Sequence, residues 1–316
     1  MQTIAISHGR GVLNLNDREG ARDMLRGVFS AMITPFDKSE NIDEQAFETL
    51  LNWTINKGAN GVFVVSSTGE SWALSFEEKV RLFQLAVAVV KKRVPVIAGV
   101  GVPSTREAIR LAQAAQAAGV DYVCAVPPSF VRPTQDELIA HYSALAQAVD
   151  LPLLLYNIPM LAGNVVAVPA VRTLAERFPR IVGIKDSSGD LTLLNDLLLH
   201  RRPDFSVVTG IDTLVLPGLL AGSQGAILGS ANVCPELALD IVRLFDAGRL
   251  DEARTVQNRL SRFWLAMGLG SFPAPVKAAL ELRGLPAGDP RRPIAPLNGD
   301  QREALRRELR AMGVMG

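Results

Sequence analysis

Cysteine and histidine are scarce in this chain of 316 residues, and their scarcity excludes several classes of protein. The two cysteines, Cys124 and Cys234, are too few for a disulfide scaffold and fit a reducing compartment. Neither lies in a CxxC or CxxH motif, and the three histidines form no HExxH motif, so no metal site is indicated. The glycine pattern at residues 99–104 lacks the third glycine of a dinucleotide-binding loop, so a nicotinamide cofactor is not expected.

An excess of one charge and long apolar runs are lacking too. The formal net charge is +1, which gives no reason to expect nucleic acid or an anionic membrane surface as a partner. No segment reaches the roughly 18 uncharged apolar residues of a membrane span. Residues 1–25 lack the apolar core of a signal peptide. We therefore expect a soluble, cytoplasmic protein.

Short apolar runs alternate with amphipathic helical segments along most of the chain. Such alternation predicts a parallel sheet covered by helices. Eight units in about 205 residues match a (β/α)8 TIM barrel of the α/β class, with an open doubly wound sheet as the alternative architecture. The runs are residues 28–33, 61–65, 95–100, 122–126, 151–156, 181–185, 205–209 and 225–228.

The segments on either side of the runs predict how the chain is divided. We expect an N-terminal extension over residues 1–25, the barrel over 26–233, and a C-terminal helical extension over 234–316 packed on the barrel. Capping boxes, in which a hydroxyl and a glutamate satisfy free N–H groups at a helix start, are indicated at Ser75, Ser104 and Thr134. Helices of the extension are expected over residues 235–246, 250–267, 275–282 and 300–312.

Lys185 gives the first indication of chemistry. It closes an apolar run that is typical of a buried strand, and the polar residues Asp186-Ser187-Ser188 follow it. A low dielectric disfavours the charged form of an amine, and a neutral amine attacks ketones or aldehydes to form a Schiff base. The structural alternative is a lysine that extends its ammonium into solvent from a strand end.

Polar residues that end the other runs are the next candidates, because active sites of barrels lie at the C-terminal ends of the strands. Ser67 and Thr68 can bind a carboxylate together with the N–H groups of their turn, or they can be turn formers only. Tyr156 can face the Lys185 amine from the adjacent strand, or it can be a core ring. We expect Asp186 to be a strand-end or helix-cap carboxylate. The seventh and eighth runs add Gly210, Asp212, Gly229 and Ser230 to this mouth.

Five motifs also occur in a specific order and spacing. They are Thr34-Pro35-Phe36, Ser67-Thr68-Gly69-Glu70-Ser71, Tyr156-Asn157-Ile158-Pro159, Gly183-Ile184-Lys185-Asp186-Ser187-Ser188-Gly189 and Pro273-Ala-Pro-Val-Lys277. In this order they resemble the dihydrodipicolinate synthase and N-acetylneuraminate lyase superfamily of pyruvate-type class I aldolases, from about Gly27 to the C-terminus.

The resemblance implies a role for each site residue. Lys185 would condense with the ketone of pyruvate or another 2-oxo acid, and Tyr156 would relay protons. The imine would act as the electron sink, so no metal or organic cofactor would be needed, and the usual assembly would be a homotetramer. The residues expected to bind substrate are Ser67, Thr68, Gly210, Asp212, Ile227, Gly229 and Leu161.

Departures from the family pattern bear on the second substrate. The synthase branch has an arginine where this chain has Leu161, a threonine at Ser67, and a tyrosine borrowed from a neighbouring subunit at Phe130. Leucine and phenylalanine cannot supply the bidentate carboxylate contact or the proton path. The Ser-Thr-Gly-Glu and Tyr-Asn-Ile-Pro motifs are closer to the aldolase branch, although only Asp212 remains of the two acidic residues typical of sialic acid lyases.

We therefore expect a Schiff-base-forming class I lyase that cleaves or condenses a 4-hydroxy-2-oxo acid, with pyruvate as the common half. The alternatives are dihydrodipicolinate synthase, or a dehydratase or deaminase of a 2-oxo acid that uses the same lysine imine. A barrel that binds a small ligand without turnover is the remote alternative, and the presence of Lys185 and Tyr156 argues against it.

Overall fold

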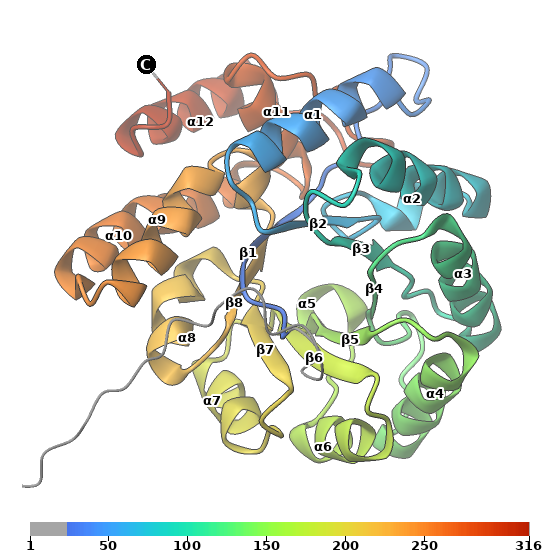
Figure 1. The fold of residues 1–316 in the computed structure, drawn as a ribbon. Coiled ribbons are helices and arrows are strands. Elements are labelled where there is room, and N and C mark those ends of the chain that lie inside the picture. Colours follow the sequence, from blue (N-terminus) through green and yellow to red (C-terminus); the bar gives the residue numbers. More distant parts are fainter. Residues whose placement is uncertain (1–23, 316) are drawn as a thin grey trace, which may run out of the picture.

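Eight parallel strands close into a barrel in a computed structural model that describes residues 24–315 (Figure 1). The strands follow one another around the barrel in chain order, and the first pairs with the eighth. The predicted TIM barrel is therefore confirmed, and the open-sheet alternative is wrong. The strands are Gly27–Ala31 (β1), Gly61–Val64 (β2), Val96–Gly99 (β3), Tyr122–Ala125 (β4), Leu153–Asn157 (β5), Ile181–Asp186 (β6), Ser206–Thr209 (β7) and Gly225–Leu228 (β8).

Helices cover the outside of this barrel (Figure 1). Those that connect successive strands are Glu44–Asn56 (α1), Phe76–Val90 (α2), Thr105–Ala118 (α3), Gln135–Ala148 (α4), Pro159–Ala162 (α5), Val168–Arg177 (α6), Leu191–Leu199 (α7) and Val215–Ala221 (α8). Short 3-10 turns lie at Ser71–Ala73 (η1), Asp212–Leu214 (η2) and Ser230–Asn232 (η3).

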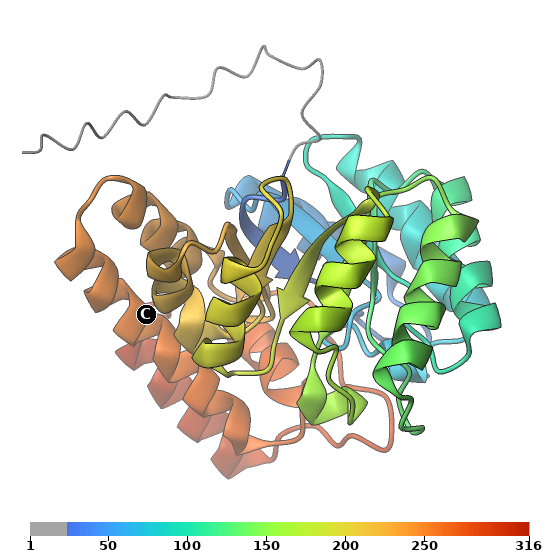
Figure 2. The ribbon, with the colours of Figure 1, turned by 90° about the horizontal axis from the view of Figure 1, so that it is seen from below.

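Four further helices and a 3-10 turn follow the last strand. Figure 2 shows these C-terminal segments beside the barrel and across one of its ends. We retain residue 233 as the proposed boundary of the extension; residues 1–23 of the expected N-terminal extension lie outside the described residues. The C-terminal elements are Pro235–Asp246 (α9), Leu250–Ala266 (α10), Met267–Leu269 (η4), Ala274–Leu282 (α11) and Gly299–Ala311 (α12).

The strands are buried on both faces, which explains why they read as continuous apolar runs. Alternate residues point to opposite sides, so Val28 packs outward under the helices and Phe29 packs into the barrel. Both β5 and β6 extend one residue beyond their predicted ends. There Asn157 pairs with Asp186, and the Asn157 amide donates a hydrogen bond of 2.8 Å to the Asp186 carboxylate.

Capping follows the sequence patterns in part. Ser75 and Thr134 form complete capping boxes at the starts of α2 and α4. Ser104 does begin α3, but its side chain makes no capping hydrogen bond. A further capping box, which the Ser/Thr–Glu pattern does not include, joins Asn298 to Gln301 at the start of α12.

A buried ion pair connects the C-terminal extension to the turn after β2. Lys277 Nζ on α11 lies 2.6 Å from Glu70 Oε1, and the two side chains are 1% and 0% exposed. Lys277 Nζ also donates to the Asp289 carbonyl at 3.0 Å and lies 4.3 Å from the centroid of the Phe36 ring. The Arg291 N–H donates to Glu70 Oε2 at 2.9 Å. Burial lowers the pKa of Lys277, and the Glu70 charge opposes that shift.

Removing the amine from this pair should destabilise the fold strongly. Lys277→Met leaves the Glu70 carboxylate buried without its cation, which typically costs about 3–5 kcal/mol. Chemical denaturation should therefore show a large loss of unfolding free energy, and the double variant Glu70→Gln/Lys277→Met should lose less than the sum of the singles. Arg254→Met, in an exposed pair with Asp251, is the control. A Lys277→Met protein as stable as this control would show that the pair contributes nothing.

Candidate active site

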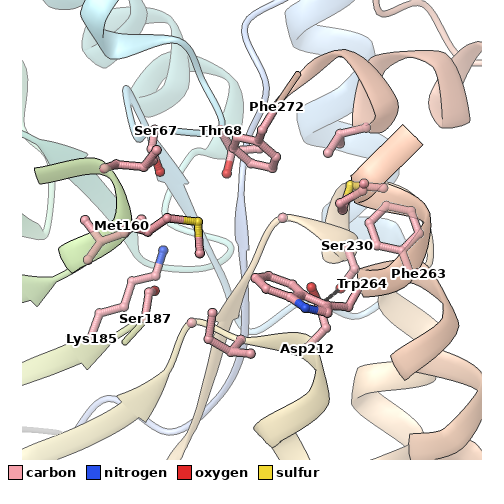
Figure 3. Close-up of a pocket in the computed structure, with 18 of the residues that line it drawn as sticks. Ser67, Thr68, Met160, Lys185, Ser187, Asp212, Ser230, Phe263, Trp264 and Phe272 are labelled. Carbon is pink, nitrogen blue, oxygen red and sulfur yellow. Dashed lines mark hydrogen bonds between the residues drawn. The ribbon is translucent and has the colours of Figure 1, made fainter. Parts of the chain in front are cut away.

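A cavity of about 470 Å³ opens at the C-terminal ends of the strands. Figure 3 shows side chains from the barrel and from the C-terminal extension around it. The predicted site residues that line it are Ser67, Thr68, Tyr156, Leu161, Lys185, Gly210, Asp212 and Gly229. The structure thus brings together residues from five strand ends that are far apart in the sequence.

Ile227 is the one predicted substrate residue that does not line this cavity. It is buried in the barrel interior and pairs with Phe29 of β1. Gly229 follows the end of β8 and lines the cavity, whereas Ile227 lies within the strand and deeper in the barrel. Its part in substrate binding therefore stays a prediction, and in the structure its side chain fills the barrel interior.

Lys185 and Tyr156 are partners across adjacent strands. They occupy paired positions of β6 and β5, and Lys185 Nζ donates a hydrogen bond of 3.1 Å to Tyr156 Oη. Tyr156 Oη lies 3.3 Å from Ser67 Oγ, so three polar groups form a continuous chain. Lys185 is only 3% exposed, which excludes the alternative of a lysine extended into solvent. Such a chain can carry a proton to or from an atom bound at the amine.

The turn that carries Ser67 and Thr68 has an unusual backbone. Val65 and Glu70, on either side of it, have φ angles of 58° and 55°, a left-handed conformation that is uncommon for residues other than glycine. Thr34 Oγ1 holds the turn by donating to the Gly69 carbonyl at 2.7 Å. Strain of this kind persists only where the surroundings enforce it, and it gathers at functional sites.

Glycines at residues 99 and 101 allow neighbouring backbone to approach closely. A Cβ on Gly99 would lie 2.0 Å from the Val65 carbonyl oxygen, and one on Gly101 would lie 2.4 Å from the Val126 nitrogen. The partial dinucleotide-loop pattern thus has a packing cause. Gly99 in particular leaves room for the carbonyl of the strained residue that precedes Ser67 and Thr68.

Asp212 is a buried carboxyl in the same cavity. Burial raises its pKa to about 6, and hydrogen bonding by Ser230 and the charge of Lys185 oppose the shift. The Ser230 hydroxyl donates to the Asp212 carboxyl, and Gln257 Nε2 donates to the Asp212 carbonyl at 2.8 Å. Asp186, in contrast, does not line the cavity. Its carboxylate accepts hydrogen bonds of 2.8 Å from Asn157 and Ser188, in keeping with the structural role expected for it.

Several cavity residues were not predicted. Ser187 belongs to the motif around Lys185 and was not predicted as a site residue, yet it lines the cavity, and its buried hydroxyl has no hydrogen-bond partner. The sequence signal that could have located the others is the run Phe263-Trp264-Leu265 at the end of α10. Three consecutive apolar residues exceed the single stripe that an amphipathic helix turns to its core. Further cavity residues of this kind are Met160, Met267 and Phe272.

Two absences hold for residues 24–315. No group of three histidine, cysteine, aspartate or glutamate side chains in this part of the chain is placed to hold a metal ion. None of its helices combines the length and the apolar character needed to cross a membrane.

Comparison with known proteins gives a consistent result. The sequence profile of the dihydrodipicolinate synthetase family matches residues 24–312. Proteins named 4-hydroxy-tetrahydrodipicolinate synthase include that of Syntrophus aciditrophicus, 40% identical over 93% of this chain and 100% of the relative. The protein of that name from Bacillus subtilis is 38% identical over 88% of this chain and 96% of the relative.

Solved structures agree. The synthase of Methylacidiphilum fumariolicum SolV has a TM-score of 0.88 and 37% identity, and covers 92% of this chain and 96% of its own. YagE is a prophage protein of the same family from E. coli K12, and its structure was solved in complex with pyruvate. It has a TM-score of 0.90 and 29% identity, and the match covers 92% of this chain and 100% of its own.

The names of these relatives bear on the enzyme class and the family branch that the sequence led us to expect. The family and the class of enzyme, a lyase of the class I aldolase type, are confirmed. The expected closer resemblance to the aldolase branch is wrong, because relatives at 36–40% identity carry the synthase name. The names therefore favour the synthase alternative over the aldolase interpretation.

The buried Asp212 carboxyl predicts a pH-dependent stability. Its folded pKa of about 6 lies above the ordinary 3.8, so the folded state binds more protons between these values and stability should fall as pH rises from about 4 to 6. Asp212→Asn should remove a fall on the order of 1–3 kcal/mol. Urea unfolding at pH 4 and pH 7 measures it, with the exposed Asp251→Asn as control. Identical pH dependence in wild type and Asp212→Asn would contradict the expectation.

Proposed function

This chain belongs to the dihydrodipicolinate synthetase family of pyruvate-using class I lyases, and from that premise we propose that Lys185 forms the imine that joins pyruvate to an aldehyde. The observation that carries the proposal is the buried contact of 3.1 Å between Lys185 Nζ and Tyr156 Oη, inside a cavity at the strand ends. An amine and a phenol in contact provide the nucleophile and the proton donor that imine formation needs.

In the first half of the reaction, the Lys185 amine attacks C2 of pyruvate. Tyr156 gives a proton to the carbinolamine oxygen, which leaves as water, and the Ser67 hydroxyl, 3.3 Å from Tyr156 Oη, stabilises the phenolate that forms. The hydroxyls of Ser67 and Thr68, with the N–H groups of their turn, hold the pyruvate carboxylate. The arrangement orients the ketone over the amine before any bond forms.

In the second half, C3 of pyruvate loses a proton to the Tyr156 phenolate, and the protonated imine accepts the electrons released. The resulting enamine carbon attacks the aldehyde carbon, and the aldehyde oxygen takes a proton from Tyr156. Water then hydrolyses the imine, which releases a 4-hydroxy-2-oxo acid and restores Lys185; the reverse sequence is cleavage. Because the imine is the electron sink, this chemistry requires no metal or organic cofactor.

The second substrate is either aspartate semialdehyde or an aldehyde without its carboxylate. The names of the relatives favour aspartate semialdehyde, as in 4-hydroxy-tetrahydrodipicolinate synthase. One observation favours a different aldehyde: Leu161 lines the cavity where the synthase pattern has an arginine. Product analysis separates both from a dehydratase or deaminase, which would release water or ammonia without making or breaking a carbon–carbon bond.

A homotetramer remains our proposal for the assembly. Apolar side chains such as Leu199, which is 79% exposed, and Phe130 lie on the surface of the single chain, where association would cover them. A relative at 30% identity is described as a monomeric synthase variant, so light scattering on this protein is the necessary measurement.

Borohydride reduction in the presence of pyruvate should trap Lys185. Reduction converts the imine into a stable secondary amine, so intact mass should increase by one pyruvate adduct per chain. Lys185→Ala should give no adduct. The proposal fails if wild type stays unmodified or if the alanine variant is labelled equally.

Deleting the Tyr156 hydroxyl should slow turnover far more than it disturbs the fold. Tyr156→Phe keeps the ring and removes the proton donor, so kcat should fall by about 10²–10⁴ while the adduct with pyruvate still forms slowly. Tyr142→Phe is the control, since its hydroxyl donates to the Ala125 carbonyl at 3.2 Å and does not line the cavity. Near-normal kcat in Tyr156→Phe would place the proton relay elsewhere.

A further inference from the structure

Much of the cavity lies beyond the groups that would hold pyruvate. Its volume of about 470 Å³ is larger than a three-carbon acid needs, and the remaining wall comes from two segments. One is α5, with Met160 and Leu161, and the other is the C-terminal extension, with Trp264 and Phe272. Figure 3 shows Met160, Trp264 and Phe272 around the space into which Lys185 Nζ points. All four side chains are apolar over most of their surface.

The charges around this space are few. Among the described residues that line the cavity, Lys185 is the one cation and Asp212 the one acidic residue. In the proposed function the Lys185 nitrogen becomes the imine, and Ser67 and Thr68 serve the pyruvate carboxylate. A second carboxylate against Leu161, Trp264 and Phe272 would therefore lose part of its water without a free cation in this cavity, and it would share the cavity with Asp212; the adjoining cavity, which shares Ser67, Leu161 and Phe272, has its own cation, Lys79. Burial of an unpaired charge is strongly unfavourable.

The polar atoms that remain suit a neutral group. Ser187 Oγ is buried beside Lys185 and has no hydrogen-bond partner, and the Ser230 hydroxyl is engaged with Asp212. An unpartnered hydroxyl next to the reacting amine can bond to the oxygen of an aldehyde, which becomes the new hydroxyl of the product. It cannot act as the counter-ion of a carboxylate.

We propose that the second substrate of this chain is an uncharged aldehyde with an apolar side chain, aromatic or branched-alkyl, which packs against Leu161, Trp264 and Phe272. The inference rests on the proposed function and specifies its second half. The enamine carbon of pyruvate forms a bond to the aldehyde carbon, the aldehyde oxygen gains a proton, and hydrolysis returns the amine. Each methylene buried against this wall should raise kcat/KM about fourfold.

The test compares aldehydes at saturating pyruvate. Benzaldehyde and isovaleraldehyde should each give a higher kcat/KM than aspartate semialdehyde by about tenfold or more, with 4-hydroxy-2-oxo acids as products. Trp264→Ala should lower kcat/KM for the apolar aldehydes about tenfold and leave the KM for pyruvate unchanged. Leu250→Ala, on the surface at the start of α10, is the control on the same helix and should change neither.

The variant Leu161→Arg should show the opposite preference between the aldehydes in the same assay. A cation at this position should raise kcat/KM for aspartate semialdehyde by about one to two decades, because a charged hydrogen bond replaces an unpaired carboxylate. The same variant should lose activity with the apolar aldehydes. The preference between charged and apolar aldehydes would then change with the chemistry of residue 161. A purely structural role of Leu161 would not produce such a change.

Borohydride trapping with pyruvate accompanies every variant. If the adduct forms and aspartate semialdehyde is nonetheless the better aldehyde for wild type, the apolar subsite is wrong and the proposed function stands. If no adduct forms in wild type, both are overturned. If Trp264→Ala forms the adduct but retains wild-type kcat/KM for the apolar aldehydes, the wall does not bind the second substrate.

Discussion

The buried ion pair between Lys277 and Glu70 is the constraint on which the site depends. Two side chains with almost no exposure must neutralise each other, because either alone would be an unpaired charge in the interior. Glu70 belongs to the turn that carries Ser67 and Thr68, and Lys277 belongs to α11. The pair therefore connects the turn that carries Ser67 and Thr68 to the helical extension, and it adds to the contacts that hold the strained residue Glu70 in place.

Sequence patterns predicted the barrel and much of its mouth because each depends on local information. An apolar run that must be buried on both faces is visible in the residues themselves, and polar residues at its end lie at the mouth by topology. Lys185 and Tyr156 could be placed opposite each other because consecutive strands are neighbours. The glycine at position 99 could not be explained in this way, because it makes room for the carbonyl of Val65, which follows the neighbouring strand β2.

Other features depend on how deep a side chain lies in the barrel, on hydrogen-bond geometry and on contacts between segments far apart in the sequence, and none of these is visible in the sequence. Ile227 is buried in the barrel interior and does not line the cavity. Ser104 has the capping pattern without the capping bond. Trp264 reaches the cavity from α10, about eighty residues after Lys185; its apolar run indicates an additional buried face, but not that this face lines the cavity. The branch of the family was misjudged for a related reason: a few motif residues report on the site, whereas identity over the chain reports on ancestry.

The cavity has walls from two sources. The lysine, the tyrosine and the hydroxyl-bearing turn all come from strand ends of the barrel, whereas Trp264 and Phe272 come from the extension. Substitutions in α10 or the segment after it can thus reshape what the cavity accepts while the bond-making atoms keep their positions. Under the proposed function, replacing the α10–η4 segment by that of a relative would change the products and leave the imine chemistry of the barrel unchanged.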